Sequence, residues 1–274
     1  MKYLSLILLA TVLSLTSCRS YKYRNINYLQ AKYLQNTKLP GLNIFRPRKP
    51  ANGNDVLIFI HGAEAKVNTK ETYGYLGRNF AKKNVISIIP DYTLSPASNY
   101  KNAVEQVAQT IQWAKENIAD YGGNPDRIFI MGYATGAHIA ALASMKPEHT
   151  NDYVLQGLIL NEATGLNIKD YLKDYAASEK NEYFAAWDQD TVAQTEASPV
   201  NYIGEKTPPT KIYVGTKTNP AIFKDNEQFM IKLQEVQPEA QLDLLDKKHG
   251  AMMAQYLWPW SQRYKEIVSF MKKQ

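Results

Sequence analysis

The stretch GGNPDRIFIMGYATGAHIAA, residues 122–141, decides the fold. It opens with a Gly-Gly turn, and Arg127 to Met131 then form an apolar, β-rich run that predicts a strand. The small-residue segment from Gly136 to Met145 predicts a helix. Few residues separate the two, so the strand runs into the helix through a tight turn flanked by glycines.

This layout is that of a nucleophile elbow, Gly-x-Ser-x-Gly, in which small residues two before and two after the nucleophile permit a strained turn. Gly132 and Gly136 occupy the two flanks, and Ala134 stands at the nucleophile position. Alanine has no nucleophilic atom. Thr135 carries a hydroxyl, but an elbow shifted by one residue would need a small residue where Tyr133 stands.

Strands and helices alternate on both sides of this stretch, which predicts a mostly parallel sheet covered by helices. The expected strands are 41–46, 55–60, 85–89, 127–131, 155–160, 211–214 and 241–245, and the expected helices are 99–121, 136–145, 224–236 and 258–273. The polar stretch 167–197 contains no strand pattern and is expected to be a helical cap inserted in the domain.

Three further segments resemble one protein family. Phe59-Ile-His-Gly-Ala63 is similar to a His-Gly-Gly loop, Asp91-Tyr-Thr-Leu-Ser-Pro96 is similar to an Asp-Tyr-Arg-Leu-Ala-Pro stretch, and Lys248-His249-Gly250 lies where a triad histidine is expected. Together with the elbow, they make the chain resemble the α/β-hydrolases of the carboxylesterase, hormone-sensitive-lipase-like and kynurenine-formamidase-like branch. The resemblance covers residues 41–273. It implies a three-layer α/β-hydrolase fold with a twisted, mostly parallel sheet, helices on both faces and a small helical cap, over a domain of residues 41–274.

The resemblance also implies a set of site residues. His249 takes the position of the triad base, and the backbone N–H groups of Gly62, Ala63 and Thr135 take the positions of an oxyanion hole. The loop after the seventh strand of the family, residues 215–220 here, contains no acid. Glu162, at the end of the strand before it, is a candidate substitute, although a surface or cap-facing glutamate is the alternative interpretation.

The departures from the family pattern fall on catalytic positions. Besides Ala134, the His-Gly-Gly-x-Trp loop has become His61-Gly-Ala-Glu-Ala65, which puts the carboxylate of Glu64 beside the expected oxyanion hole. A negative charge there opposes a developing oxyanion. The sequence therefore predicts a hydrolase fold whose catalytic triad is incomplete.

The amino end resembles a bacterial lipoprotein signal. Lys2 is followed by an apolar run to Leu15, and Leu15-Thr-Ser-Cys18 resembles a lipobox, in which the cysteine thiol takes the diacylglycerol. We expect residues 1–17 to be the signal peptide, Cys18 to be acylated and residues 18–40 to be a tether, with an edge strand or a strip on lipid headgroups as alternatives for residues 19–38. The expected location is the bacterial cell envelope, on a periplasm-facing membrane surface.

The composition argues against disulfide-stabilised, metal-dependent and nucleic-acid-binding proteins. The 274 residues, 45% of them hydrophobic, suit one large α/β domain, and a single cysteine cannot form an internal disulfide. The four histidines show no His-Glu-x-x-His spacing, so no metal and no cofactor are expected. The net charge of +6 comes from 32 basic residues interleaved with 26 acidic ones, which does not favour nucleic-acid binding.

Three functional hypotheses follow. The first is a membrane-anchored, esterase-like protein that binds a small acyl-type ligand or a protein partner without turnover. The second is an active ester or amide hydrolase in which His249 activates water with Glu162 in support. The third is a serine enzyme inactivated by an engineered Ala134, which the other departures disfavour because a designer needs only one substitution.

Overall fold

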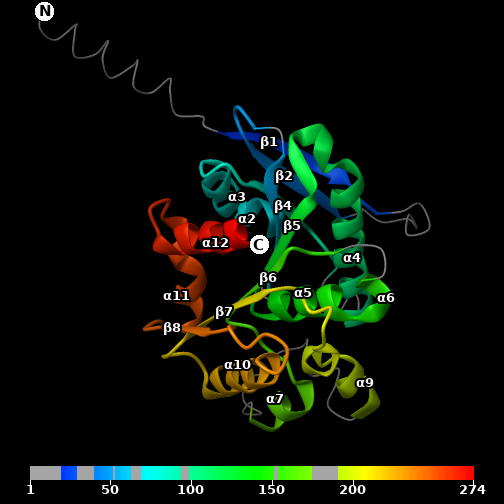
Figure 1. Ribbon diagram of the computed structural model, residues 1–274, viewed down its shortest axis with the longest axis vertical. Helices are drawn as coiled ribbons and strands as arrows, with labels where there is room; N and C mark the ends of the chain where they lie inside the picture. Colours follow the sequence, from blue (N-terminus) through cyan, green and yellow to red (C-terminus); the bar gives the residue numbers. More distant parts are fainter. Residues whose placement is uncertain are drawn as a thin grey trace, which may run out of the picture.

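Eight strands form one sheet in the order β1-β2-β4-β3-β5-β6-β7-β8 (Figure 1). The computed structural model describes residues 20–29, 40–51, 53–62, 69–93, 99–150, 154–174 and 191–274. The strands are β1 (Ser20–Asn27), β2 (Gly41–Pro47), β3 (Asn54–Ile60), β4 (Ile86–Pro90), β5 (Gly123–Tyr133), β6 (Gly157–Asn161), β7 (Thr210–Gly215) and β8 (Leu242–Leu245). β1 pairs antiparallel with β2 and β2 with β4, whereas all pairs from β4 to β8 are parallel.

Helices cover both faces of this sheet. The main helices are α3 (Gly74–Ala81), α4 (Tyr100–Asn117), α5 (Thr135–Met145), α10 (Pro220–Leu233), α11 (His249–Ala254) and α12 (Gln262–Lys273). Shorter helices are α2 (Thr69–Thr72), α6 (Pro147–Thr150), α7 (Ile168–Asp174) and α9 (Thr191–Glu196), and 3-10 turns lie at Ile118–Tyr121, Pro199–Tyr202 and Gln255–Leu257. Among the described residues, no helix combines the length and the apolar character needed to cross a bilayer.

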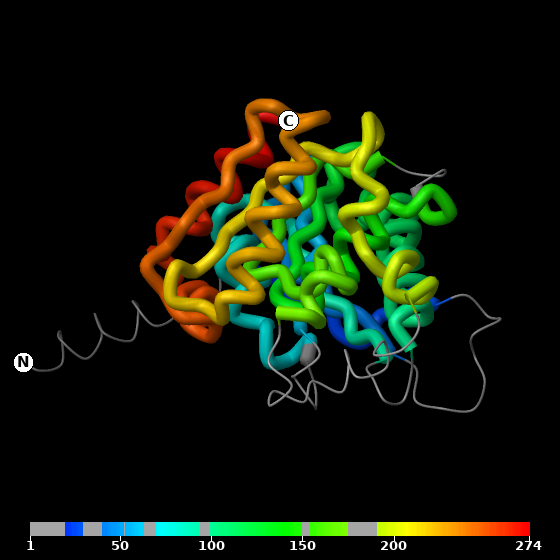
Figure 2. Tube along the Cα trace, turned by 90° about the horizontal axis from the view of Figure 1, so that it is seen from below, coloured from blue at the N-terminus to red at the C-terminus, as the bar shows by residue number. Residues whose placement is uncertain are grey.

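The inner strands, β2 to β7, bury both of their faces over most of their length, and alternate residues supply two separate cores. In β3, Val56, Ile58 and Ile60 belong to the core under α4, α5 and α10. Leu57 and Phe59 belong to the core under α3, α11 and α12. Figure 2 shows α11 and α12 (orange to red) on one side of the molecule and α4 (cyan to green) on the other. The expected three-layer α/β architecture is confirmed.

The amino-terminal part of the domain differs from the expectation. Ser20–Asn27, within the segment expected to be a tether, forms edge strand β1, which pairs with β2 from Ser20↔Pro47 to Asn27↔Gly41. Edge strand was one of the three alternatives for this segment. The signal peptide 1–17, Cys18 and residues 30–39 lie outside the described residues.

Two helix starts also differ. α10 begins at Pro220 rather than at residue 224, because the Asn219 side chain caps it by accepting from the Ala221 N–H at 2.9 Å. α12 begins at Gln262 rather than at residue 258, since the segment Trp258 to Ser261 forms a loop. The expected cap 167–197 is helical where it is described, in α7 and α9, and its residues 175–190 lie outside the description.

Candidate functional site

The turn between β5 and α5 keeps the geometry of a nucleophile elbow. Ala134 has φ 51° and ψ −123°, in a region that L-residues rarely occupy, and its carbonyl accepts from the Ala137 N–H at 2.9 Å. The sharp turn is centred on Ala134, so Thr135 is the first residue of α5 and does not occupy the nucleophile position.

The two flanking glycines are required by close backbone contacts. A Cβ at Gly132 would lie 2.3 Å from the Cα of Ala137, and a Cβ at Gly136 would lie 2.3 Å from the carbonyl oxygen of His61. Both neighbours are backbone atoms that cannot move aside. The elbow therefore depends on glycine at both flanks, even though its central residue is alanine.

Glu162 and His249, 87 positions apart, meet at the carboxyl edge of the sheet. Glu162 directly follows β6, and His249 begins α11 after β8. The His249 Nδ1 lies 2.9 Å from Glu162 Oε2. Assigning the ring proton to Nδ1 from this bond leaves Nε2 with the lone pair of a general base. The structure thus brings together the two residues expected to be base and acid.

The Glu162 carboxylate is buried, with no exposed side-chain surface, and is held by two further donors. It accepts from the Gly215 backbone N–H and, at 2.6 Å, from the Thr218 hydroxyl. Gly215 is the last residue of β7, and Thr218 lies in the loop that follows it, where the family pattern has its acid. This loop contributes hydrogen-bond donors to a carboxylate on the neighbouring strand, which the sequence pattern did not reveal.

Glu162 is also strained, with φ 55°. Four described residues other than glycine have positive φ, and two of them are asparagines, which tolerate this region. The other two are Ala134 and Glu162. Backbone strain of this kind costs about 1–3 kcal/mol per residue and clusters at functional sites. The strained positions therefore coincide with the expected nucleophile and acid.

Tyr133 brings the histidine close to the elbow. Its ring stacks on the His249 ring, with centroids 5.1 Å apart and planes 29° apart, and its hydroxyl donates to the His249 carbonyl at 3.2 Å. Because Tyr133 directly precedes Ala134, this stack holds His249 beside the turn. In the sequence, Tyr133 stands out only as too large to flank a shifted elbow.

The expected oxyanion loop follows β3. Gly62 lies against the elbow, since a Cβ placed on it would be 3.6 Å from the Ala134 Cβ. His61 is fully buried between the rings of Tyr92 and Tyr73, and burial lowers its pKa to about 4, so it packs as a neutral side chain. Ala63 and Glu64 lie outside the described residues.

Two further buried polar side chains form hydrogen bonds with the backbone of segments near the site. The buried carboxylate of Asp225 accepts from the backbone N–H groups of Leu166 and Asn167, in the loop after Glu162, and burial raises its pKa to about 7. His138 in α5 makes a 2.6 Å hydrogen bond to the carbonyl of Ala197 at the end of the cap, and burial lowers its pKa to about 4.

The described residues contain no group of three or more His, Cys, Asp or Glu side chains that could hold a metal ion. Within the described part of the chain, the site combines an oriented imidazole, a buried carboxylate and an elbow whose central residue has no hydroxyl. Such groups can bind a carbonyl compound or withdraw a proton, and Ala134 itself cannot form an acyl intermediate.

Comparisons with known proteins identify the class. The BD-FAE family model matches residues 42–233. Esterase LipQ of Mycobacterium tuberculosis (strain ATCC 25618 / H37Rv) is 37% identical over 108 residues, 39% of this chain and 25% of the relative. A probable isoprenylcysteine alpha-carbonyl methylesterase of Oryza sativa subsp. japonica is 31% identical over 105 residues, 38% of this chain and 25% of the relative. The chain thus spans about a quarter of the length of these curated relatives.

Solved structures agree on the fold. Esterase B from Lactobacillus Rhamnosis (HN001) has a TM-score of 0.74 at 14% identity, covering 93% of this chain and 87% of that one. An esterase from Pyrobaculum calidifontis has a TM-score of 0.67 at 18% identity, covering 84% and 78%. The molecule is an esterase-like α/β-hydrolase. Within that class, the chain belongs to the BD-FAE family.

Proposed function

We propose that this chain is an esterase-fold protein that binds a small acyl-type ligand, an ester or amide, at the carboxyl edge of its sheet without hydrolysing it. The observation that carries the proposal is the conformation of Ala134. This residue adopts the strained backbone conformation of a nucleophile, yet its side chain has no nucleophilic atom. The elbow lies close to Gly62 and, through the Tyr133–His249 stack, to the Glu162–His249 pair, which supports a binding site for a carbonyl group there. The esterase relatives support the ligand class.

A second function is favoured by one specific contact. The 2.9 Å hydrogen bond between Glu162 and His249 keeps the base oriented although the serine is absent. An oriented imidazole can take a proton from water, which would then attack an ester carbonyl directly. In this case the chain would be a slow hydrolase that forms no covalent intermediate.

Hydrolysis and binding assays on the purified chain separate these functions. Neither function predicts labelling by a fluorophosphonate probe, because only an activated serine reacts. For the binding function we expect no hydrolysis of 4-nitrophenyl butyrate above the background rate. The same ester should still bind saturably, and a bulky replacement of the residue that faces the elbow, Gly62→Leu, should abolish this binding. Hydrolysis that disappears in His249→Ala would contradict the binding function and favour water activation.

We also propose that Cys18 is acylated and anchors the domain to a membrane of the bacterial cell envelope, on the periplasmic side. The support is the lipobox-like sequence around the single cysteine. Mass spectrometry of the amino-terminal peptide should show the acyl mass, and Cys18→Ser should lose both this mass and membrane association. Membrane association that persists in Cys18→Ser would show that another feature retains the protein there.

A further inference from the structure

We propose that the anchored domain rests on the bilayer with the amino edge of its parallel strands, so that the candidate site faces away from the membrane. This inference rests on the acylation of Cys18 proposed above. The amino edge is then the surface that contacts lipid, and the ligand reaches the site from the side opposite the membrane.

The strand register places the start of β1 at the edge opposite the site. Ser20 pairs with Pro47, the last residue of β2. β2 runs antiparallel to β4, and its Phe45 pairs with Ser87, the second residue of β4. Ser20 therefore lies at the amino edge of the parallel strands.

The site residues lie at the other edge. Ala134, Glu162 and His249 follow the carboxyl ends of β5, β6 and β8. β3, at the centre of the sheet, has seven residues, which corresponds to about 23 Å between the two edges at 3.3 Å per residue. The site and the start of β1 therefore lie at opposite ends of the strands.

Covalent geometry keeps the anchor close to that amino edge. Cys18 precedes Ser20 by two residues, and two extended residues span at most about 7 Å. Acyl chains on Cys18 lie in the hydrocarbon region, so Ser20 is held at the level of the lipid headgroups. The domain consequently has little freedom to turn its opposite edge toward the bilayer.

The amino edge carries exposed aromatic side chains suited to a membrane interface. Tyr21 is 47% exposed, and its ring lies 5.2 Å from the Arg46 guanidinium. Trp258 and Trp260 are 56% and 74% exposed and stack on each other at 5.4 Å. Their loop belongs to this edge because the ammonium group of Lys83, in the turn before β4, donates to the Pro259 carbonyl at 3.2 Å.

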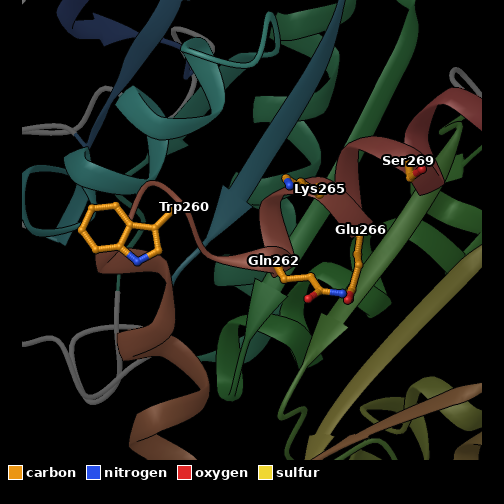
Figure 3. Close-up of a pocket in the computed structure, with 5 residues that line it drawn as sticks. All are labelled: Trp260, Gln262, Lys265, Glu266 and Ser269. Atoms are coloured by element: carbon orange, nitrogen blue, oxygen red, sulfur yellow. The ribbon is translucent and has the colours of Figure 1, made fainter.

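Figure 3 shows Trp260 on the loop that leads into α12, with Gln262, Lys265, Glu266 and Ser269 along the helix. These five residues line an open groove of about 400 Å³. Indole rings beside a lysine are typical of surfaces that lie among lipid headgroups. There the apolar ring is buried, and the ammonium group remains hydrated. The groove extends the aromatic surface along α12.

Charge favours anionic lipid at the part of this edge next to β1, β2 and β4, whereas the turns before β7 and β8, at the other end of the sheet, carry the exposed Glu205, Glu235 and Glu239. Exposed or partly exposed cations lie in the turns before and after the strands, at Arg48, Lys49, Lys82 and Lys83. Of the nearby carboxylates, Asp55 is paired with Arg127 at 2.5 Å and Asp126 with Lys115 at 2.6 Å, and Asp120 lies in the turn before β5. Basic residues near an anionic leaflet are each stabilised by the surface potential.

The orientation has a consequence for the ligand. A site that faces away from the bilayer receives molecules from the aqueous compartment. The ligand class is therefore a water-soluble ester or amide, as opposed to an acyl chain embedded in the membrane that carries the protein.

Fluorescence quenching tests the orientation on the full, acylated chain in vesicles of phosphatidylcholine and phosphatidylglycerol. Acylated Cys18 has no free thiol, so a single introduced cysteine can carry an environment-sensitive dye. The positions are Arg48→Cys and Trp260→Cys at the amino edge, Lys217→Cys beside the site, and Ile231→Cys on the outer surface of α10 as the control. The quencher is a lipid with a nitroxide on its headgroup.

Dyes at positions 48 and 260 should lose most of their fluorescence, whereas dyes at 217 and 231 should lose little. Equal or stronger quenching at position 217 would overturn the orientation. Absence of the acyl mass on the amino-terminal peptide would instead overturn the anchor, and the orientation with it. An acylated chain with the reversed quenching pattern would overturn the orientation alone and leave the proposed ligand binding intact.

Discussion

Ala134 keeps the backbone of a nucleophile without its chemistry. Its φ of 51° is unfavourable for alanine, and the neighbouring chain imposes it through the contacts of Gly132 and Gly136. A strained alanine at this position still fixes how the end of β5 turns into α5. The strain is therefore a property of the scaffold and should appear in stability measurements.

We expect Ala134→Gly to raise the free energy of unfolding by about 1 kcal/mol, because relief of roughly 1–3 kcal/mol of strain exceeds the entropy cost of glycine. Urea denaturation measures this change. Ala141→Gly, in the interior of α5 at normal helical φ, is the matched control and should lower stability by about 1 kcal/mol or more. A loss of stability in Ala134→Gly equal to that of the control would contradict the strain.

The residues of the site differ in how far they could be predicted. The elbow was found from the sequence because two glycines and an abrupt change from strand to helix are local signals. The pairing of Glu162 with His249 was expected only through the family resemblance, because the two residues lie in distant segments and neither segment alone selects the other. The Gly215 and Thr218 donors could not be predicted, since a loop without an acid carries no sign that it donates to a carboxylate on the neighbouring strand.

The elbow as an element depends on the close approach of α5 to the end of β5. We expect Gly132→Ala to lower the free energy of unfolding by about 3 kcal/mol, because its Cβ would lie 2.3 Å from backbone. Gly204→Ala is the control: a Cβ there meets nothing within 4 Å, and stability should change by less than about 0.5 kcal/mol. Thermal unfolding monitored by circular dichroism gives both values, and similar values for the two variants would refute the packing requirement.

The secondary structure elements were largely predictable where apolar periodicity was strong. β3, β4 and β7 lie within a few residues of their expected positions. The tyrosine-rich β1 was left open because an edge strand with one exposed face resembles a polar tether in sequence. The expected start of the last helix at Trp258 rests on interpreting the aromatic run ending at Trp260 as an anchor of that helix against the sheet, whereas its two tryptophans are exposed in a loop.

At the scale of the whole molecule, burial of polar groups couples stability to pH. Burial lowers the pKa of His138 from 6.5 to about 4. As the pH falls below 6.5, the unfolded chain binds a proton that the folded chain cannot bind until about pH 4. The unfolded state therefore gains stability through this window, and the folded state loses it.

We expect the stability advantage of the parent over His138→Gln to shrink by about 3 kcal/mol between pH 7.5 and pH 4, since glutamine does not titrate. The other buried groups that titrate, His61 and Asp225, are present in both proteins and cancel in the difference. Urea denaturation across this pH range measures it. Parallel stability curves would indicate that His138 does not titrate differently in the two states.

The central claim is that the scaffold of an esterase is intact around a missing nucleophile. Hydrolysis of 4-nitrophenyl acetate by Ala134→Ser tests it most directly. The rate should rise on the order of a thousandfold or more above the parent, as the millionfold cost of removing a protease serine suggests. It should fall back when His249→Ala or Glu162→Gln is added. No gain in Ala134→Ser, or a gain that survives the loss of His249, would contradict the account.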